Sequence, residues 1–260
     1  MSHAVAMNLG QQFMDARYIQ NSVDSSLNVF KNRSIHCLTP KGLYVLERFI
    51  HKTGVDADHL QIMLDTEITC AKLFYLQRGP VEDELVFRHN GIIALFRWFV
   101  GQQPNHPQKS TNAADSLRQY IRRSKGVTLM ESTERGLLGK GVLHEHCFDA
   151  VEALEWLCDF TSVIGRQEAA EVMAHFDRLG LITLVGNPEK TRKNAIIFRV
   201  HGPIPKEDFT VSANGEYRCV NKALYKVTEK GCHVAGWNGE GYLLEKDSNE
   251  IFVNPPSPLE

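Results

Sequence analysis

A repeated helix-to-strand motif constrains this chain more than any other feature. Residues 11–19 read QQFMDARYI and residues 174–182 read AHFDRLGLI, 163 residues further along. Residues 31–35 (KNRSI) and 193–197 (KNAII) repeat at nearly the same distance. Each long motif is typical of an amphipathic helix that ends and leads into a strand. Because repeats at a fixed distance indicate copies of one structural unit, we expect two related units.

A second pair of similar segments follows. Residues 37–45 read CLTPKGLYV and residues 226–234 read KVTEKGCHV. Thr39 and Thr228 stand where a strand would give way to a helix, and a threonine hydroxyl accepts hydrogen bonds from the first free N–H groups of a helix. Pro40 suits the first helical position, where its missing N–H costs nothing. Both copies therefore predict a strand followed by a capped helix.

The second copy has clearer boundaries than the first. Asp149 and Glu152 form a capping-box pattern before an apolar helix, and a turn at 163–165 precedes another. Gly180 suits the left-handed residue after a helix. Residues 181–185 and 195–200 read as strands around a turn at 186–190. Helices followed by a β-hairpin form a winged helix. The second helix has an apolar face at Ala169, Val172, Met173, Phe176 and Leu179.

Helical patterns also fill the segment between the copies, at residues 60–64, 68–76, 90–99 and 113–124. The predicted fold class is therefore α+β and predominantly helical. We expect part of a winged helix over residues 1–50, a helical linker over 51–135 and a winged helix with a C-terminal extension over 136–237. The polar residues 238–260 are expected to form a flexible tail.

Composition and charge argue against several functional classes of protein. The net charge is −2, whereas proteins that neutralise phosphates are usually basic. No apolar run approaches the roughly 18 residues of a membrane-spanning helix, and the N-terminus does not read as a signal peptide. The six cysteines form no Cys-x-x-Cys pair, so free thiols in a reducing cytoplasm are expected.

Longer strings resemble a known family. Residues 147–157, CFDAVEALEWL, resemble the core motif of the DEP domain. Residues 13–17, 38–49, 156–163 and 180–185 are similar to fungal regulators of G-protein signalling of the developmental-regulator and pheromone-desensitisation type. These carry tandem DEP domains before an RGS box, and the resemblance covers residues 8–237.

The resemblance implies a non-catalytic chain. Only 23 residues follow Trp237, too few for an RGS box, so the GTPase-activating residues have no counterpart here. The first DEP copy begins at its third helix, which suggests a fragment or a truncated relative. We therefore expect the face of Phe13 and Ile19 to pack on the helical segment or on a second chain, which also allows a homodimer.

The resemblance further implies an interaction module. It would dock a regulator onto the cytoplasmic tail of a G-protein-coupled receptor and so attenuate signalling. The expected location is cytoplasmic and peripheral at the plasma membrane, with an anionic membrane surface as another partner. From charge and position we expect basic side chains near the wing to pair with acidic or phosphorylated groups. These are Arg178, Lys190, Arg192, Lys193 and Arg199.

Other functions have less support in the sequence. A winged-helix nucleic-acid binder is the alternative, but its recognition helix would carry Glu168, Glu171 and Asp177. The residues from His144 to Cys147 resemble metal ligands, yet no second pair accompanies them, so no metal or other cofactor is expected. No catalytic constellation is present. The three tryptophans are expected to be core anchors, with an exposed peptide-binding Trp as the alternative. A basic cluster, Arg118, Arg122, Arg123 and Lys125, is expected to be a solvated face, with contact to an acidic membrane or an acidic receptor tail as the alternative.

Overall fold

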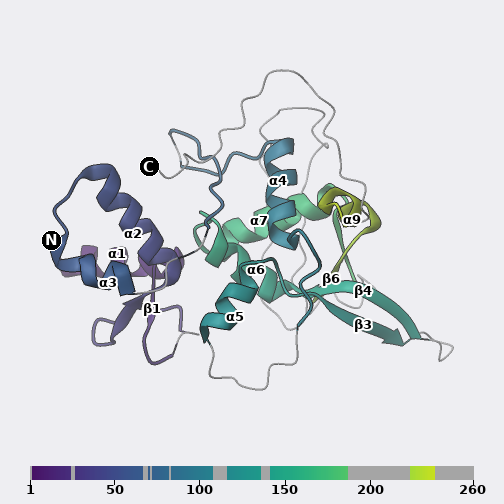
Figure 1. The fold of residues 1–260 in the computed structure, drawn as a ribbon, viewed down its shortest axis with the longest axis horizontal. Helices are drawn as coiled ribbons and strands as arrows, with labels where there is room; N and C mark the ends of the chain where they lie inside the picture. The colour runs from purple at the N-terminus through teal and green to yellow at the C-terminus, as the bar shows by residue number, and fades with distance from the viewer. Residues whose placement is uncertain are drawn as a thin grey trace.

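The computed structural model describes residues 2–24, 27–66, 70, 72–81, 83–107, 116–135, 141–186 and 223–237. Its elements fall into a first unit, followed by a short helical stretch and a second unit (Figure 1). The first unit comprises α1 (His3–Asp15), β1 (Ile19–Asn21), β2 (His36–Leu38) and α2 (Pro40–Thr53). The stretch after it holds η1 (Asp58–Leu60) and α3 (Gln61–Thr66).

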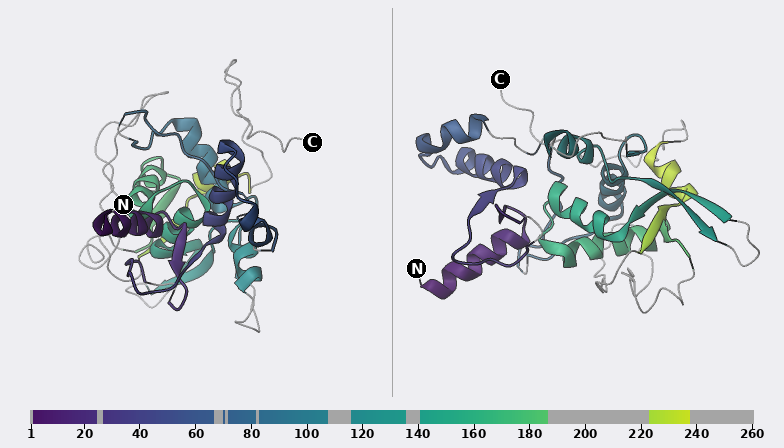
Figure 2. Two further views of the ribbon diagram at one scale, coloured as in Figure 1. Left: turned by 90° about the vertical axis from the view of Figure 1, so that its left-hand side faces the viewer. Right: turned by 90° about the horizontal axis from the view of Figure 1, so that it is seen from below.

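The second unit packs three helices against an antiparallel sheet. The sheet has the strand order β3-β4-β6-β5. Helices α4, α6 and α7 contribute most of one continuous core, which includes Phe96, Phe148, Trp156 and Phe176. The elements are α4 (His89–Val100), α5 (Ser116–Arg123), β3 (Met130–Arg135), β4 (Gly141–Asp149), α6 (Ala150–Phe160), α7 (Gly165–Arg178), β5 (Ile182–Leu184), β6 (Leu224–Val227) and α9 (Glu229–Ala235). The β3–β4 hairpin projects from the body (Figures 1 and 2).

The predicted repeat is confirmed by strand register. Ile19 pairs with Leu38 in the first unit, as Ile182 pairs with Val227 in the second. The turns after α1 and α7 are also alike. Arg17 has a φ of 59° and Gly180 a φ of 68°. A residue in the left-handed conformation therefore follows the helix at the equivalent position of both copies. This conformation is strained for arginine but not for glycine.

The predicted helix caps are confirmed in both units. The Thr39 hydroxyl accepts from the Gly42 N–H at 2.9 Å, and the Thr228 hydroxyl accepts from the Gly231 N–H at 3.0 Å. Each hydroxyl also donates to the turn of its own unit, Thr39 to the Arg17 carbonyl oxygen and Thr228 to the Gly180 carbonyl oxygen. One threonine thus joins a turn to the next helix.

Glycine is required at the third position of both capped helices. A Cβ on Gly42 would stand 1.9 Å from the Tyr18 carbonyl oxygen, and a Cβ on Gly231 would stand 2.2 Å from the Leu181 carbonyl oxygen. The helix therefore crosses the strand too closely for any side chain. This close approach explains why the motif keeps Thr-x-x-Gly in both copies.

The structure is α+β, with winged-helix organisation, as the fold prediction states. Helix α4 confirms the pattern at residues 90–99, and α5 confirms the end of the pattern at 113–124. Asp149 caps α6 by accepting from the Val151 and Glu152 N–H groups. The predicted return strand at 195–200 lies outside the described residues, and β6 is the described partner of β5.

The prediction of a helix at residues 68–76 is wrong for the residues described there. Phe74 is extended and forms a β-bridge with Thr161. Its N–H donates to the Phe160 carbonyl at 3.0 Å, and its own carbonyl accepts from the Ser162 N–H at 2.9 Å. Pairing with a distant segment therefore outweighs the local apolar periodicity.

The predicted domain boundaries stay predictions, but packing crosses one of them. Helix α4 and strand β3 come from the segment predicted as a linker. Ile92, Phe96 and Phe99 of α4 nevertheless belong to the same core as α6 and α7. None of the described helices has the length and apolar character that crossing a membrane requires.

Polar contacts hold the two units together. Glu155 on α6 accepts from Arg17 of the first unit and, at 2.6 Å, from Arg166. The buried Lys41 ammonium, on α2, donates to the Val163 carbonyl oxygen at 3.1 Å. Arg78, in the segment that connects the units, makes a bidentate pair with Glu168 at 2.8 and 2.7 Å and so fixes this connection to the second unit. Charged groups that are partly desolvated and fully paired fix one relative placement.

Candidate functional site

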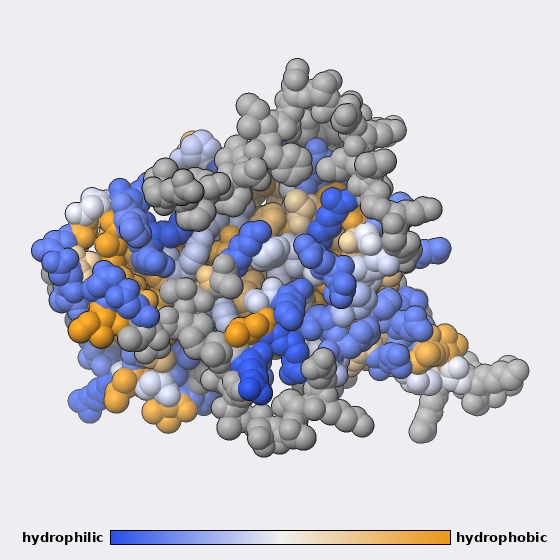
Figure 3. Space-filling model, in the orientation of Figure 1, coloured by the Kyte–Doolittle hydropathy of each residue, from blue (hydrophilic) through white to orange (hydrophobic). Residues whose placement is uncertain are grey.

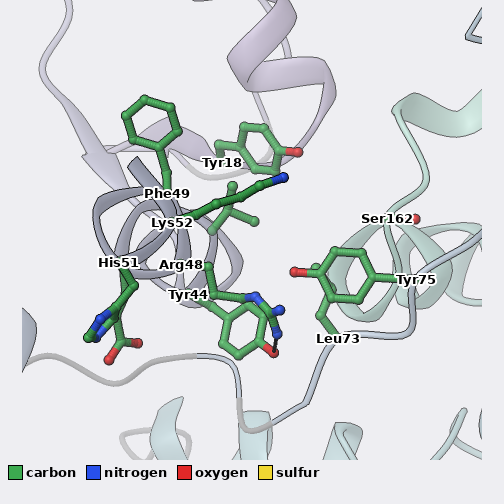
Figure 4. A pocket seen from close by; sticks show the side chains of 11 residues that line it. Tyr18, Tyr44, Arg48, Phe49, His51, Lys52, Leu73, Tyr75 and Ser162 are labelled. Carbon is green, nitrogen blue, oxygen red and sulfur yellow. Dashed lines mark hydrogen bonds between the residues drawn. The ribbon is translucent and has the colours of Figure 1, made fainter. Parts of the chain in front are cut away.

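An open groove of about 840 Å³ lies at the junction of the two units (Figure 4). One wall is α2 of the first unit. The other wall is the extended segment 72–76, which rests on the second unit. The side chains that give this junction groove its character are aromatic or basic: Tyr18, Tyr44, Arg48, Phe49, Lys52 and Tyr75.

Helical spacing places the first wall. Tyr44, Arg48 and Lys52 are four residues apart along α2, so they lie on one face of the helix. Thr39 and Pro40 fix where that helix begins, and Gly54, with a φ of 65°, ends it. The sequence therefore sets the direction in which this row of side chains points.

Alternation places the second wall. Phe74 and Leu76 pack against the core of the second unit, and Tyr75 between them is 51% exposed. Successive side chains of an extended segment point to opposite sides, so Tyr75 faces the groove. The Leu76 N–H donates to the Ser162 hydroxyl at 2.8 Å and anchors this wall.

Arg48 is the central cation of the groove. Its Nη1 donates to the Tyr44 hydroxyl at 3.1 Å. Its guanidinium lies 5.7 Å from the centroid of the Tyr44 ring and 5.4 Å from that of the Tyr75 ring (Figure 4). Contacts of this kind favour the charged form and orient the guanidinium. The hydrogen bond that Arg48 donates to Tyr44, together with the neighbouring Tyr75 and Tyr44 side chains, raises the pKa of Arg48 above its ordinary value.

The tyrosines remain hydrogen-bond donors. Burial raises the pKa of Tyr75 and of Tyr18 above the ordinary tyrosine value. Both hydroxyls are therefore protonated at neutral pH. Arg48 and Lys52 are exposed, and Glu47 is the acidic residue in the lining. The groove thus offers cations, O–H donors and aromatic faces, which suit an acidic peptide.

The predicted docking cations are only partly described. Arg178 ends α7, and both of its terminal nitrogens are buried without a hydrogen-bond partner among the described residues. Lys190, Arg192, Lys193 and Arg199 lie outside the described residues. The docking role of these five side chains therefore stays a prediction. The prediction did not include the groove, although the spacing of Tyr44, Arg48 and Lys52 was a readable signal.

The nucleic-acid alternative finds no support in α7. Within this helix Gln167 is the exposed residue, and the others are buried or half-buried. Glu168 is held by Arg78, and burial raises the pKa of Glu171. A helix that is enclosed by its own unit does not enter a DNA groove.

The described residues also give no support to a metal site at His144–Cys147. The described residues contain no group of three ligand side chains that could hold an ion. Cys147 is buried, and His146 has a φ of 55° beside a register shift in the β3–β4 pairing. This irregularity breaks the simple alternation that would have placed His144 and His146 on one side of the strand.

Two of the tryptophans and one residue of the basic cluster make structural contacts, while Arg118 and Lys125 of that cluster are exposed. Trp156 is 1% exposed and its indole N–H donates to the Arg123 carbonyl at 2.7 Å. The indole N–H of Trp237 donates to the Gly101 carbonyl at 3.1 Å. Arg123 pairs with Asp159 at 2.8 Å, so it is more than a solvated charge. The five described cysteines are free thiols, as predicted.

Comparison with known proteins adds a family context. Residues 1–66 match the model of the fungal-differentiation regulator winged helix domain. Over 240 residues the chain is 26% identical to the developmental regulator flbA of Emericella nidulans. Both similarities point to fungal developmental regulators. The alignment covers 91% of this chain but 31% of that relative, so the chain spans about a third of its length. No solved structure matches.

The matched relative is named as a developmental regulator, and the matched family model as a winged helix domain of fungal-differentiation regulators. The family match names a winged helix, which agrees with the caps and hairpin register of the first unit. Neither match names a DEP domain. The DEP assignment therefore remains part of the proposal below.

Proposed function

We propose that this chain is a non-catalytic DEP-type docking module of a fungal regulator of heterotrimeric G-protein signalling. It binds an acidic or phosphorylated segment in the cytoplasmic tail of a G-protein-coupled receptor and so helps to attenuate the signal. The observation that carries the proposal is the junction groove, in which Arg48 lies between the Tyr44 and Tyr75 rings. The similarity to a developmental regulator supplies the biological setting.

The chemistry of the groove favours a carboxylate or phosphate partner. A guanidinium forms paired hydrogen bonds with such groups, and Lys52 adds a second cation one turn further along α2. The aromatic rings of Phe49 and Tyr75, which are 55% and 51% exposed, can take an apolar side chain of the same peptide. Tyr and Arg dominate the binding energy of many peptide interfaces.

The test is calorimetric titration of the full chain with receptor-tail peptides, with and without phosphate. We expect micromolar binding, and an Arg48→Glu/Lys52→Glu variant that binds at least about tenfold more weakly. The matched control is Lys31→Glu/Arg33→Glu, which makes the same charge change on exposed residues away from the groove. Equal affinities for these two variants would refute the assignment of the groove.

Two further experiments test the wing cations and the membrane surface that the sequence predicts. An Arg192→Glu/Lys193→Glu variant tests the wing cations, and unchanged tail binding would remove them from the site. Anionic vesicles, run in parallel, test a membrane surface as the partner. Binding to vesicles without binding to any tail would replace receptor docking by membrane anchoring.

A further inference from the structure

The C-terminal part of α7 contains buried nitrogen atoms that no hydrogen bond satisfies. They are both terminal nitrogens of Arg178 and Nε2 of His175, and within the described part of the chain none of the three has a hydrogen-bond partner. His175 as a whole is 1% exposed. Burial of an unsatisfied polar group costs free energy, and burial of an unpaired charge costs more. Buried donors of this kind are explained when they face a ligand with acceptor atoms.

The three nitrogens belong to one site. His175 and Arg178 are three residues apart on α7, and this spacing places two side chains on the same face of a helix. They are also close enough to interact, since the charge of Arg178 lowers the pKa of His175, after the larger effect of burial. The centroid of the Phe87 ring lies 4.3 Å from that of the His175 ring, and Phe87 is 5% exposed. An aromatic side chain therefore closes one side of the site.

The neighbouring carboxylates do not neutralise Arg178. Asp177 precedes it in the sequence, yet burial is the cause that shifts the pKa of Asp177, and it raises this pKa to about 6. A guanidinium paired with that carboxyl would lower the pKa instead. The pKa of Glu171 is raised as well, by burial and then by two neighbouring glutamates. The ion pairs of the described residues do not include Arg178, so its charge is available to a ligand.

We propose that His175 and Arg178 bind a free oxyanion of the phosphate type inside the second unit. A guanidinium presents two parallel N–H groups, which match two oxygens of a phosphate. Nε2 of His175 then contacts a third oxygen. With a pKa of about 4 the imidazole is neutral at pH 7, so Nε2 either donates to a P–O⁻ oxygen or accepts from a P–OH group. Hydrogen phosphate offers both groups. Because the three nitrogens are buried, a free ion fits this site without the opening that a phosphopeptide would need.

The test is calorimetric titration of the full chain with inorganic phosphate, at an ionic strength held constant with sodium chloride. We expect saturable binding with a dissociation constant below about 1 mM. Arg178→Met removes the charge and the paired donors but keeps an unbranched stem, and it should bind at least about tenfold more weakly. The matched control is Arg33→Met, the same substitution at an exposed arginine of the first unit, which should bind within about twofold of the original chain.

Thermal melts give a second measurement and verify that the variants fold. Without phosphate, Arg178→Met should melt no lower than the original chain, because it removes an unpaired buried charge. Added phosphate should raise the melting temperature of the original chain and of Arg33→Met, but not that of Arg178→Met. Arg178→Lys keeps the charge without the paired donors, so its affinity for phosphate should lie between those of Arg178→Met and the original chain.

Four results would overturn the proposal. The first is no binding to the original chain at about 10 mM phosphate, and the second is equal binding by Arg178→Met and Arg33→Met. The third is binding that Arg178→Met keeps and Arg48→Glu/Lys52→Glu loses, which would place the ion in the junction groove. The fourth is an equal effect of sodium chloride or sodium acetate at the same ionic strength, which would show an adventitious ion only. Failure of the receptor-tail titration leaves this test unaffected, because the groove lining does not include His175 or Arg178.

Discussion

The Lys41 ammonium donates a 2.7 Å hydrogen bond to the Cys158 carbonyl oxygen, across the junction of the two units. Burial lowers the pKa of Lys41 to about 8, and this is the largest cause of its shift. Lys41 is therefore a cation that the folded state holds at a cost, in exchange for two hydrogen bonds to the neighbouring unit.

Lys41→Met is expected to remove the pH-dependent contribution of Lys41 to stability, which increases as the pH rises. The unfolded chain binds more protons than the folded chain between pH 8 and the ordinary lysine pKa of 10.5, so the Lys41 contribution rises with pH in this window. The gap in unfolding free energy between the original chain and the variant should widen by about 3 kcal/mol from pH 7.5 to pH 10.5. Urea titrations at both pH values measure it, and a constant gap would contradict the assignment.

His175 is expected to make the fold sensitive to acid. It is 1% exposed and stacks near Phe87 at 4.3 Å, and burial lowers its pKa to about 4. The unfolded chain binds the extra proton between pH 6.5 and 4, so the His175 contribution falls as pH falls through this window. Relative to His175→Leu, the original chain should lose about 3 kcal/mol from pH 7 to pH 4.

Asp177 is expected to act in the opposite direction. Burial raises its pKa to about 6, so the folded chain binds the extra proton between pH 6 and the ordinary value of 3.8. Acidification through this window therefore stabilises the fold through Asp177. Asp177→Asn should make the acid destabilisation steeper than in the original chain. Denaturant midpoints at pH 7, 5.5 and 4.5 report this difference, and an identical slope would count against a buried carboxyl.

Gly42→Ala and Gly231→Ala are each expected to destabilise the chain by about 2–3 kcal/mol. The new Cβ meets backbone oxygen in both cases, and backbone cannot move aside as a side chain can. Gly91→Ala is the matched control, because nothing lies within 4 Å of its Cβ position in α4. It should stabilise by about 0.5–1 kcal/mol through helix propensity. Thermal unfolding of the three variants gives the comparison.

Tyr75 is expected to act through its ring more than through its hydroxyl. Tyr75→Phe keeps the face beside the Arg48 guanidinium, whereas Tyr75→Ala removes it. We expect tail-peptide affinity within about threefold for the first variant and at least about tenfold weaker for the second. A phenylalanine variant that is as weak as the alanine variant would assign the effect to the hydroxyl.

Much of the fold can be predicted from the sequence, because it depends on interactions between residues that are close along the chain. The Thr39 and Thr228 caps, the left-handed Gly180 and the apolar face of α7 follow from rules that act over a few residues. The segment around Phe74 was misread because its hydrogen bonds go to residues 160 and 162, far along the chain. The role of α4 was missed for the same reason, since its partner Phe176 is not local.

The candidate site also has one part that local sequence patterns predict and one part that depends on tertiary packing. The row from Tyr44 to Lys52 is a helical spacing that a sequence shows, but the wall that holds Tyr75 depends on the docking of two units. Arg178 is predicted as a docking cation from its charge and its position in the sequence. Its terminal nitrogens are buried, which only the tertiary environment reveals. Figure 3 shows hydrophobic residues interspersed among hydrophilic ones on the surface. The exposed apolar residues include Phe49, Val55 and Ile62.

The two walls of the groove belong to different copies of the repeat, so any ligand that spans them is also a clamp. A peptide that binds only when α2 and the 72–76 segment are side by side adds its binding free energy to the contacts of Lys41 and Glu155. At a hundred times its dissociation constant it would favour the closed junction by about 2.7 kcal/mol. The free energy of peptide binding and the stability of the junction would then be coupled. Binding of a partner would stabilise the arrangement of both units and not only the residues that it contacts.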